Sequence, residues 1–133
     1  MTKVSHRAGF EVDDDTATCW LGRGPTRSSL SVTRHGQNVE GRTVYTYEIS
    51  TPVASESGND LSTGVGIDHG PLDMLGTLLS FLGAAAESYR YEMDNPGSSG
   101  ENTDLFSTEI VEWAYRESDE LGMLQLEIEG NDE

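Results

Sequence analysis

The chain has 133 residues, with 24 acidic side chains against eight Lys and Arg, and a formal net charge of −16. This length suits one domain with one core. No apolar run reaches the roughly 18 residues that cross a bilayer, because the best candidate, residues 72–86, is shorter and contains Asp73. A chain this acidic repels phosphate backbones and anionic headgroups, so we expect neither direct nucleic-acid binding nor membrane binding.

Residues 8–50 predict antiparallel β-hairpins. The expected strands cover residues 8–12, 16–21, 28–34 and 42–50, with turns at 13–15 and 35–38. These segments combine strand-forming residues with turn-prone Asp, Gly and Asn between them. In the last strand Tyr45, Tyr47 and Ile49 share one face, so we expect that face to meet the core.

Residues 51–70 are small, polar and rich in glycine, which predicts a long loop. Val65 and Ile67 are the candidates for a short edge strand within it. Pro71 then suits the first position of a helix. Apolar side chains spaced by threes and fours from Leu72 to Met93 predict one long helix over residues 71–93.

Residues 94–104 contain an Asn-Pro-Gly-Ser-Ser-Gly run and predict a second loop. A second, shorter helix is expected over residues 105–121, capped by Ser107 or Asp104. Leucine and isoleucine then alternate with polar residues over 123–129, which predicts a closing strand. Helical spacing across the same segment is the alternative.

We therefore expect one α+β domain over residues 1–133. An antiparallel β-sheet, built from the N-terminal hairpins and joined by the strand at 123–129, packs on one long and one shorter α-helix. The second helix is expected to cover an edge of that sheet.

The candidate catalytic and metal-binding motifs have the wrong spacing or lie in the wrong structural context. Residues 13–15 resemble the start of a calcium loop, but Thr18 stands where glycine is required and Gly24 where a bidentate Glu is required. Cys19 lies in a strand beside Trp20, which favours a small core residue over a nucleophile. Asp68 is expected to cap the long helix beside an exposed histidine. We predict no catalytic, cofactor-binding or metal-binding residues and no enzymatic activity.

The uneven charge is the most informative feature. Residues 1–50 are balanced between acids and bases, whereas residues 51–133 contain eighteen acids with only Arg90 and Arg116. The single cysteine and the absence of an apolar segment after the first basic residues favour a reducing, cytoplasmic setting. Part of the second helix is expected to be internally paired, because Arg116 follows Glu112 by four residues.

These features predict a small non-enzymatic module that binds a partner protein through its acidic C-terminal part or its apolar helix. Exposed Trp113 and Tyr115 beside charged residues would form an interface anchor, with core burial of Trp113 as the alternative. The candidate partner-binding residues are Glu87, Glu92, Asp94, Glu109, Glu112, Trp113, Tyr115 and Glu120.

Three other interpretations stay open. Strips of acid could imitate the phosphates of a nucleic acid and inhibit a DNA- or RNA-binding protein. The apolar helix could instead join copies of the chain into a homo-oligomer used for assembly. Thirdly, high acid content with a single lysine, Lys3, fits adaptation to salt. Small acidic proteins of this kind are frequent in bacteriophages and mobile elements, an association that no motif establishes here.

Overall fold

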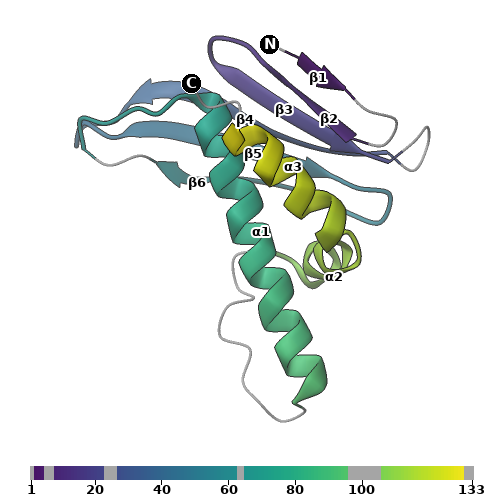
Figure 1. Ribbon diagram of the computed structural model, residues 1–133. Helices are drawn as coiled ribbons and strands as arrows, with labels where there is room; N and C mark the ends of the chain where they lie inside the picture. Colours follow the sequence, from purple (N-terminus) through teal and green to yellow (C-terminus); the bar gives the residue numbers. More distant parts are fainter. Residues whose placement is uncertain (1, 5–7, 23–26, 63–64, 96–105, 131–133) are drawn as a thin grey trace.

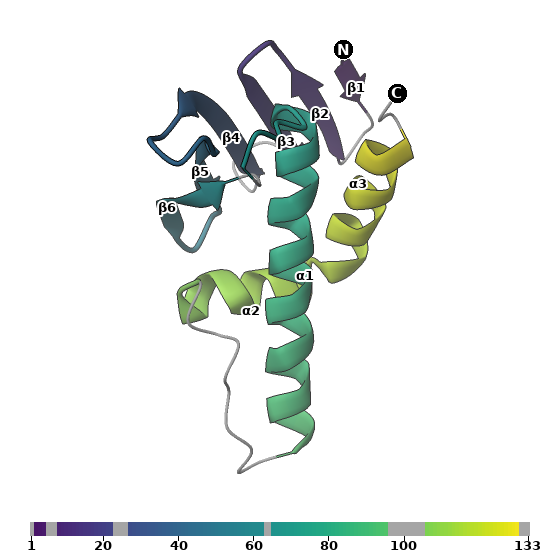
Figure 2. The same ribbon diagram turned by 90° about the vertical axis from the view of Figure 1, so that its left-hand side faces the viewer.

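The protein folds as a six-stranded antiparallel sheet packed against three helices, which confirms the α+β prediction (Figure 1). A computed structural model describes residues 2–4, 8–22, 27–62, 65–95 and 106–130, with the backbone alone for residues 2–4 and 60–62. All three helices lie on one side of the sheet, and no described helix or strand covers its other side (Figures 1 and 2).

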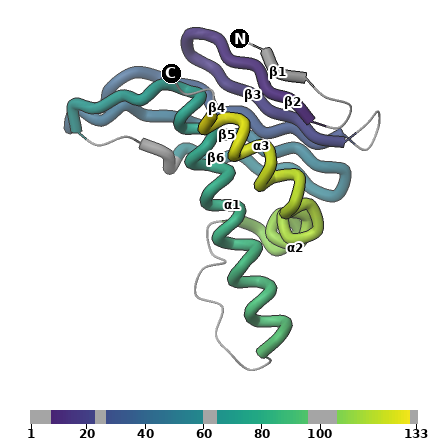
Figure 3. The backbone as a smooth tube through the Cα atoms, viewed as in Figure 1, coloured from purple at the N-terminus to yellow at the C-terminus, as the bar shows by residue number. Residues whose placement is uncertain are grey.

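The strands follow one another in space in the order of the chain, each antiparallel to the next. Figure 3 shows the backbone path of β2, β3, β4 and β5 in this order. The strands are β1 (Thr2–Val4), β2 (Ala8–Val12), β3 (Thr16–Leu21), β4 (Ser28–Gln37), β5 (Thr43–Ser50) and β6 (Ser55–Ser62). The hairpins predicted over residues 8–50 are therefore confirmed, and β1 adds a strand that the sequence analysis did not predict.

The two predicted turns have different outcomes. The acidic turn at 13–15 forms as expected, with the Asp13 amide donating to the Thr16 carbonyl at 2.7 Å. The turn expected at 35–38 lies further along, because β4 continues to Gln37. Asn38 forms it, since its side-chain oxygen accepts from the Glu40 amide at 2.9 Å and the Arg42 amide at 3.1 Å.

The loop predicted over 51–70 is wrong for its first half. β6, with the sequence Ser-Glu-Ser-Gly-Asn-Asp-Leu-Ser, pairs along β5 and forms the edge of the sheet. Its polar residues give no alternating pattern, because an edge strand gains its backbone hydrogen bonds from one neighbour and needs little apolar surface. Val65 and Ile67 are exposed and lie outside any strand.

The core lies between the inner face of the sheet and the helices. Register aligns Phe10 with Cys19 and Cys19 with Leu30, so these side chains stack across β2, β3 and β4. Tyr45, Tyr47 and Ile49 point the same way, as predicted. The buried apolar residues of the sheet are Phe10, Ala17, Cys19, Leu21, Leu30, Val32, Tyr45, Tyr47 and Ile49.

Helix α1 (Pro71–Asp94) matches the long helix predicted over 71–93. Pro71 occupies its first turn, and Gly70 is its N-cap with a positive φ of 91° that only glycine adopts readily. The first half of α1 packs on β3 and β4. The second half extends beyond the sheet, where α2 crosses it (Figure 2).

The C-terminal region corrects two predictions. The single helix expected over 105–121 is divided into α2 (Thr108–Arg116) and α3 (Ser118–Gly130), with Glu117 between them. The strand expected over 123–129 is wrong, because these residues belong to α3. Leu121, Leu124 and Ile128 are its buried side chains. The loop expected over 94–104 lies outside the described residues except for its first two, the last of α1 and its C-cap Asn95.

Helix α3 adopts the alternative periodicity because α1 offers it a close-packing surface. A Cβ added at Gly76 would lie 3.6 Å from the Ile128 side chain, an ordinary van der Waals distance, so Ile128 packs against this turn of α1. Helix α2 reaches the β6 edge at its start, where the Glu56 carboxylate accepts from the Ser107 amide at 2.8 Å. Within the described residues, no helix is both long and apolar enough to span a bilayer.

Candidate functional site: the acidic helical layer

Acidic side chains are concentrated on the helical side of the molecule. Helices α1 to α3 and the residue between α2 and α3 carry eleven acids against Arg90 and Arg116. We call these acids the acidic helical layer. They are Asp73, Glu87, Glu92, Asp94, Glu109, Glu112, Glu117, Asp119, Glu120, Glu127 and Glu129.

Between described residues, the ion pairs of this fold lie outside the layer. They join Arg34 to Asp15 and Asp68, and Arg42 to Glu40. Neither Arg90 nor Arg116 forms an ion pair with a described residue. The pairing of Arg116 with Glu112 that the sequence predicts is therefore not formed.

The candidate partner-binding acids of α1 lie on two sides of the helix. Glu87 and Asp94 are separated by two helical turns and project from the same side, about 10 Å apart along the axis. Glu92 lies about 140° away around the axis, on the side that meets α2. On α2, Glu109 is exposed. Glu120 belongs to α3, beyond the break at Glu117, so it does not extend the row of Glu109 and Glu112 on α2.

A pocket of about 290 Å³ lies between the end of α1 and the start of α2. Its lining residues are Tyr89, Glu92, Met93, Thr108 and Val111. We call it the Tyr89 pocket. Its walls are mainly apolar, and Glu92 is the one acidic residue among the described residues that line it.

Tyr89 brings three of the predicted residues together. Its hydroxyl donates a hydrogen bond to Glu112 at 3.1 Å. Its ring meets the Tyr115 ring edge-on, with centroids 5.4 Å apart. Glu92 lines the same pocket one helical turn further along α1. The sequence indicates Tyr89 only as one of the side chains spaced by threes and fours between Leu72 and Met93. Nothing in the sequence shows that α2 crosses α1 here.

The Tyr89 hydroxyl stays protonated in this setting. The hydrogen bond to Glu112 and then burial raise the pKa of Tyr89, and the nearby positive charge of Arg116 opposes them. Tyr89 therefore acts as a neutral donor that orients the Glu112 carboxylate.

Trp113 is not an exposed anchor. Its side chain is 4% exposed and belongs to the core between the helices and the sheet, which corrects its place among the partner-binding residues. The other seven candidates are exposed or half-buried. The aromatic residues that reach the surface of this region are instead Tyr115, half-buried, and Tyr91, which is 61% exposed.

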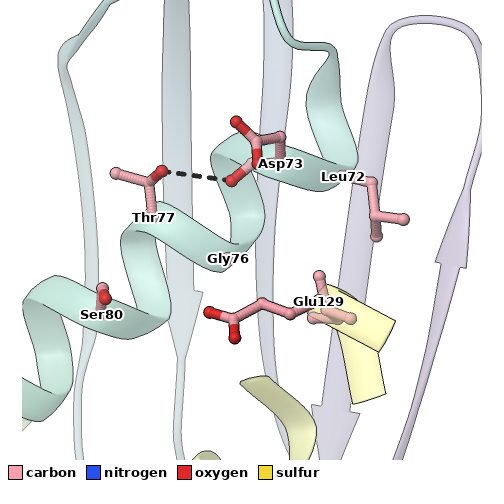
Figure 4. A pocket seen from close by; sticks show the side chains of 7 residues that line it. Leu72, Asp73, Gly76, Thr77, Ser80 and Glu129 are labelled. Atoms are coloured by element: carbon pink, nitrogen blue, oxygen red, sulfur yellow. Dashed lines mark hydrogen bonds between the residues drawn. The ribbon is translucent and has the colours of Figure 1, made fainter. Parts of the chain in front are cut away.

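A second pocket of about 110 Å³ lies between the first half of α1 and the end of α3 (Figure 4). It is lined by Asp73, Thr77, Ser80 and Glu129 with apolar neighbours. Gln125 bridges the two helices beside it, donating to Ser80 at 3.0 Å and to Glu129 at 3.2 Å. Of these hydrogen bonds, the one from Gln125 to Ser80 joins α3 to α1.

A shallow hollow of about 440 Å³ lies over β4, β5 and β6. It is lined mainly by serines, together with the carboxyl groups of Glu48 and Glu56. Arg27 lies over the Trp20 ring, 5.6 Å from its centroid.

The residues considered for chemistry have structural roles. Cys19 is fully buried, and burial raises the pKa of its thiol to about 12, so it is a protonated core residue. His35 is hydrogen-bonded to Thr46 at 2.7 Å. Asp68 accepts from the Gly70 amide just before α1, but Gly70 is the N-cap and no side chain caps the helix, so the predicted capping by Asp68 is wrong. His69 is exposed. No group of three or more His, Cys, Asp or Glu in the described ranges is arranged to hold a metal ion.

Comparisons of the chain with models of known protein families, with curated proteins and with solved structures found no match.

Proposed function

We propose that this chain is a small, non-enzymatic protein-interaction module that binds a basic partner protein through the acidic helical layer. The observation that carries the proposal is the segregation of charge: eleven acids share one side of the fold with two arginines that are not in ion pairs with described residues.

The proposed partner is a protein with a basic surface. Complementary charge accelerates encounter and selects against acidic competitors. Exposed charges are screened beyond about 10 Å at 0.1 M salt. The complex should therefore form fast and weaken as salt is added.

A binding role is also favoured by what the polar groups already do. The Cys19 thiol is buried and protonated, and Asp68 is held by donors from three segments. We place the module in a reducing, cytoplasmic setting, which the single cysteine supports.

Affinity capture with two matched variants tests the proposal. One variant neutralises the helical layer with Glu87→Gln, Glu109→Gln and Asp119→Asn, and the other neutralises the sheet with Glu11→Gln, Asp13→Asn and Glu48→Gln. All six side chains are exposed, and both variants have the same net charge. We expect the helical-layer variant to lose a basic partner that the wild-type chain and the sheet variant both retain.

Three other results of the capture experiment would lead to different conclusions. Equal loss from both variants would contradict a localised binding surface, because total charge alone would then decide. Release of the partner by duplex DNA would narrow the proposal to nucleic-acid mimicry. Capture of the chain itself, with a dimer mass by light scattering, would favour the homo-oligomer instead.

A further inference from the structure

We propose that the Tyr89 pocket holds an arginine or lysine side chain from a basic, amphipathic segment of the partner. This inference rests on the proposed function, because it names the place on the acidic helical layer where that partner is anchored. Three properties of the pocket carry it: its apolar walls, its Glu92 carboxylate and its size.

The walls suit the aliphatic stem of a long cationic side chain. Val111 is buried at the base, and the Tyr89 ring forms one side. Met93 is 54% exposed at the rim, although most exposed positions near the end of α1 are polar or charged. Methionine adapts its shape to a bound group, and the methylenes of arginine and lysine pack on apolar surface while the charge remains outside.

The charges suit the cationic end of that side chain. Glu92 lines the pocket, and Glu112 is held beside it by the Tyr89 hydroxyl. The paired Tyr89 and Tyr115 rings add an aromatic surface to which cations are attracted. A cation bound in the pocket therefore meets the Glu92 carboxylate and the Tyr89 ring, while Glu112 and Tyr115 contact Tyr89 from outside the lining.

The chain itself offers no such cation from the segment nearest in sequence. Residues 96–105, which join α1 to α2, contain Glu101 and Asp104 and no basic residue. Charge complementarity therefore favours a group from outside this segment. The volume of about 290 Å³ lies at the lower limit for small-molecule sites, which usually begin near 300 Å³. One side chain is a better fit than a separate metabolite.

Fluorescence anisotropy with a labelled amphipathic peptide of leucine and arginine tests the inference. We expect the wild-type chain to bind it and to reject the same peptide with glutamate in place of arginine. Glu92→Gln should weaken binding about fivefold, the upper range for one exposed ion pair. Glu87→Gln removes the same charge from the same helix outside the pocket and should weaken binding less.

A second pair of variants tests the apolar contact. Met93→Gln should weaken binding about threefold, because it removes apolar surface from the contact. Met123→Gln is the matched control, since Met123 is also exposed, at 63%, but lies on α3. Its affinity should stay within about twofold of wild type. Circular dichroism confirms that all variants fold.

The outcomes separate this inference from the proposed function. Equal losses for Glu92→Gln and Glu87→Gln, together with no loss for Met93→Gln, would overturn the pocket and leave the acidic helical layer as the binding surface. Failure of the wild-type chain to bind the arginine peptide would overturn the pocket as well. Failure of the capture experiment in addition would overturn the proposed function.

Discussion

Asp68 shows how much of the architecture depends on one side chain. Its carboxylate accepts from the Tyr45 hydroxyl at 2.6 Å, the Arg34 guanidinium at 2.7 Å and the Gly70 amide at 3.0 Å. These donors belong to β5, to β4 and to the N-cap of α1. Asp68 therefore fixes the start of the long helix against the sheet, and so sets where α1 meets α2.

The pH dependence of stability should report this cluster. The Tyr45 hydrogen bond is the largest of the effects that lower the pKa of Asp68 below its usual 3.8, and the Gly70 amide and Arg34 add to it. A lowered pKa in the folded state stabilises the fold above pH 3.8, and this stability is lost as pH falls through the folded pKa. We expect Asp68→Asn to be less stable than wild type at neutral pH, with a difference that shrinks below pH 3.8.

Urea unfolding over a pH series measures that difference. Asp13→Asn is the control, because Asp13 is exposed and forms no ion pair with a described residue. A difference between Asp68→Asn and wild type that is unchanged from pH 7 to well below the usual pKa of Asp would contradict the account.

The sequence alone leaves the burial of some side chains undecided. Alternation shows that Cys19 and Trp20 face opposite ways without deciding which is inward. The register with Phe10 and Leu30 decides it, because these neighbours place Cys19 over the helices. Similarly, the sequence leaves both an exposed and a buried position open for Trp113. Only the crossing of α1 and α2 shows that it is buried.

Elements whose apolar residues follow one clear spacing were predicted correctly. Elements that fit both a helical and a strand spacing, or neither, were not. Helix α1 follows from apolar spacing over its whole length. Residues 123–129 fit both an alternating and a helical pattern, and packing of Ile128 against Gly76 selects the helix, leaving Leu126 70% exposed. β6 has no apolar pattern, and its place is set by the backbone of β5.

One glycine holds β6 against the sheet. A Cβ at Gly58 would lie 2.6 Å from the Tyr47 ring. That ring is buried and packs edge-on against Phe106, with centroids 6.1 Å apart, so it has little room to move. We expect Gly58→Ala to lower the free energy of unfolding by about 1–3 kcal/mol, as overpacking does.

Gly83→Ala provides the opposite control. Gly83 lies inside α1, and a Cβ there would meet nothing within 4 Å. Alanine should therefore raise the free energy of unfolding by about 0.5–1 kcal/mol. Thermal or urea unfolding compares both variants, and a Gly58→Ala protein as stable as wild type would show that β6 does not pack on Tyr47 as described.

At the scale of the whole molecule, the fold separates two surfaces that the sequence only hints at. Counting charges along the chain predicts an acidic C-terminal part, because the helices follow the strands. It does not predict that the three helices share one side, that Glu87 and Glu92 face different ways, or that Tyr89 joins α1 to α2. Those features depend on how α1 and α2 cross, which only the tertiary structure supplies.

Under the proposed function, partners bind the helical side of this fold and not the opposite face of the sheet. Backbone amide chemical shifts recorded during a titration with the leucine–arginine peptide test it most directly. We predict shift changes in α1 and α2, largest around Tyr89 and Val111, with the amides of β3, β4 and β5 unchanged. Changes concentrated on those strands, or spread evenly over the molecule, would contradict it.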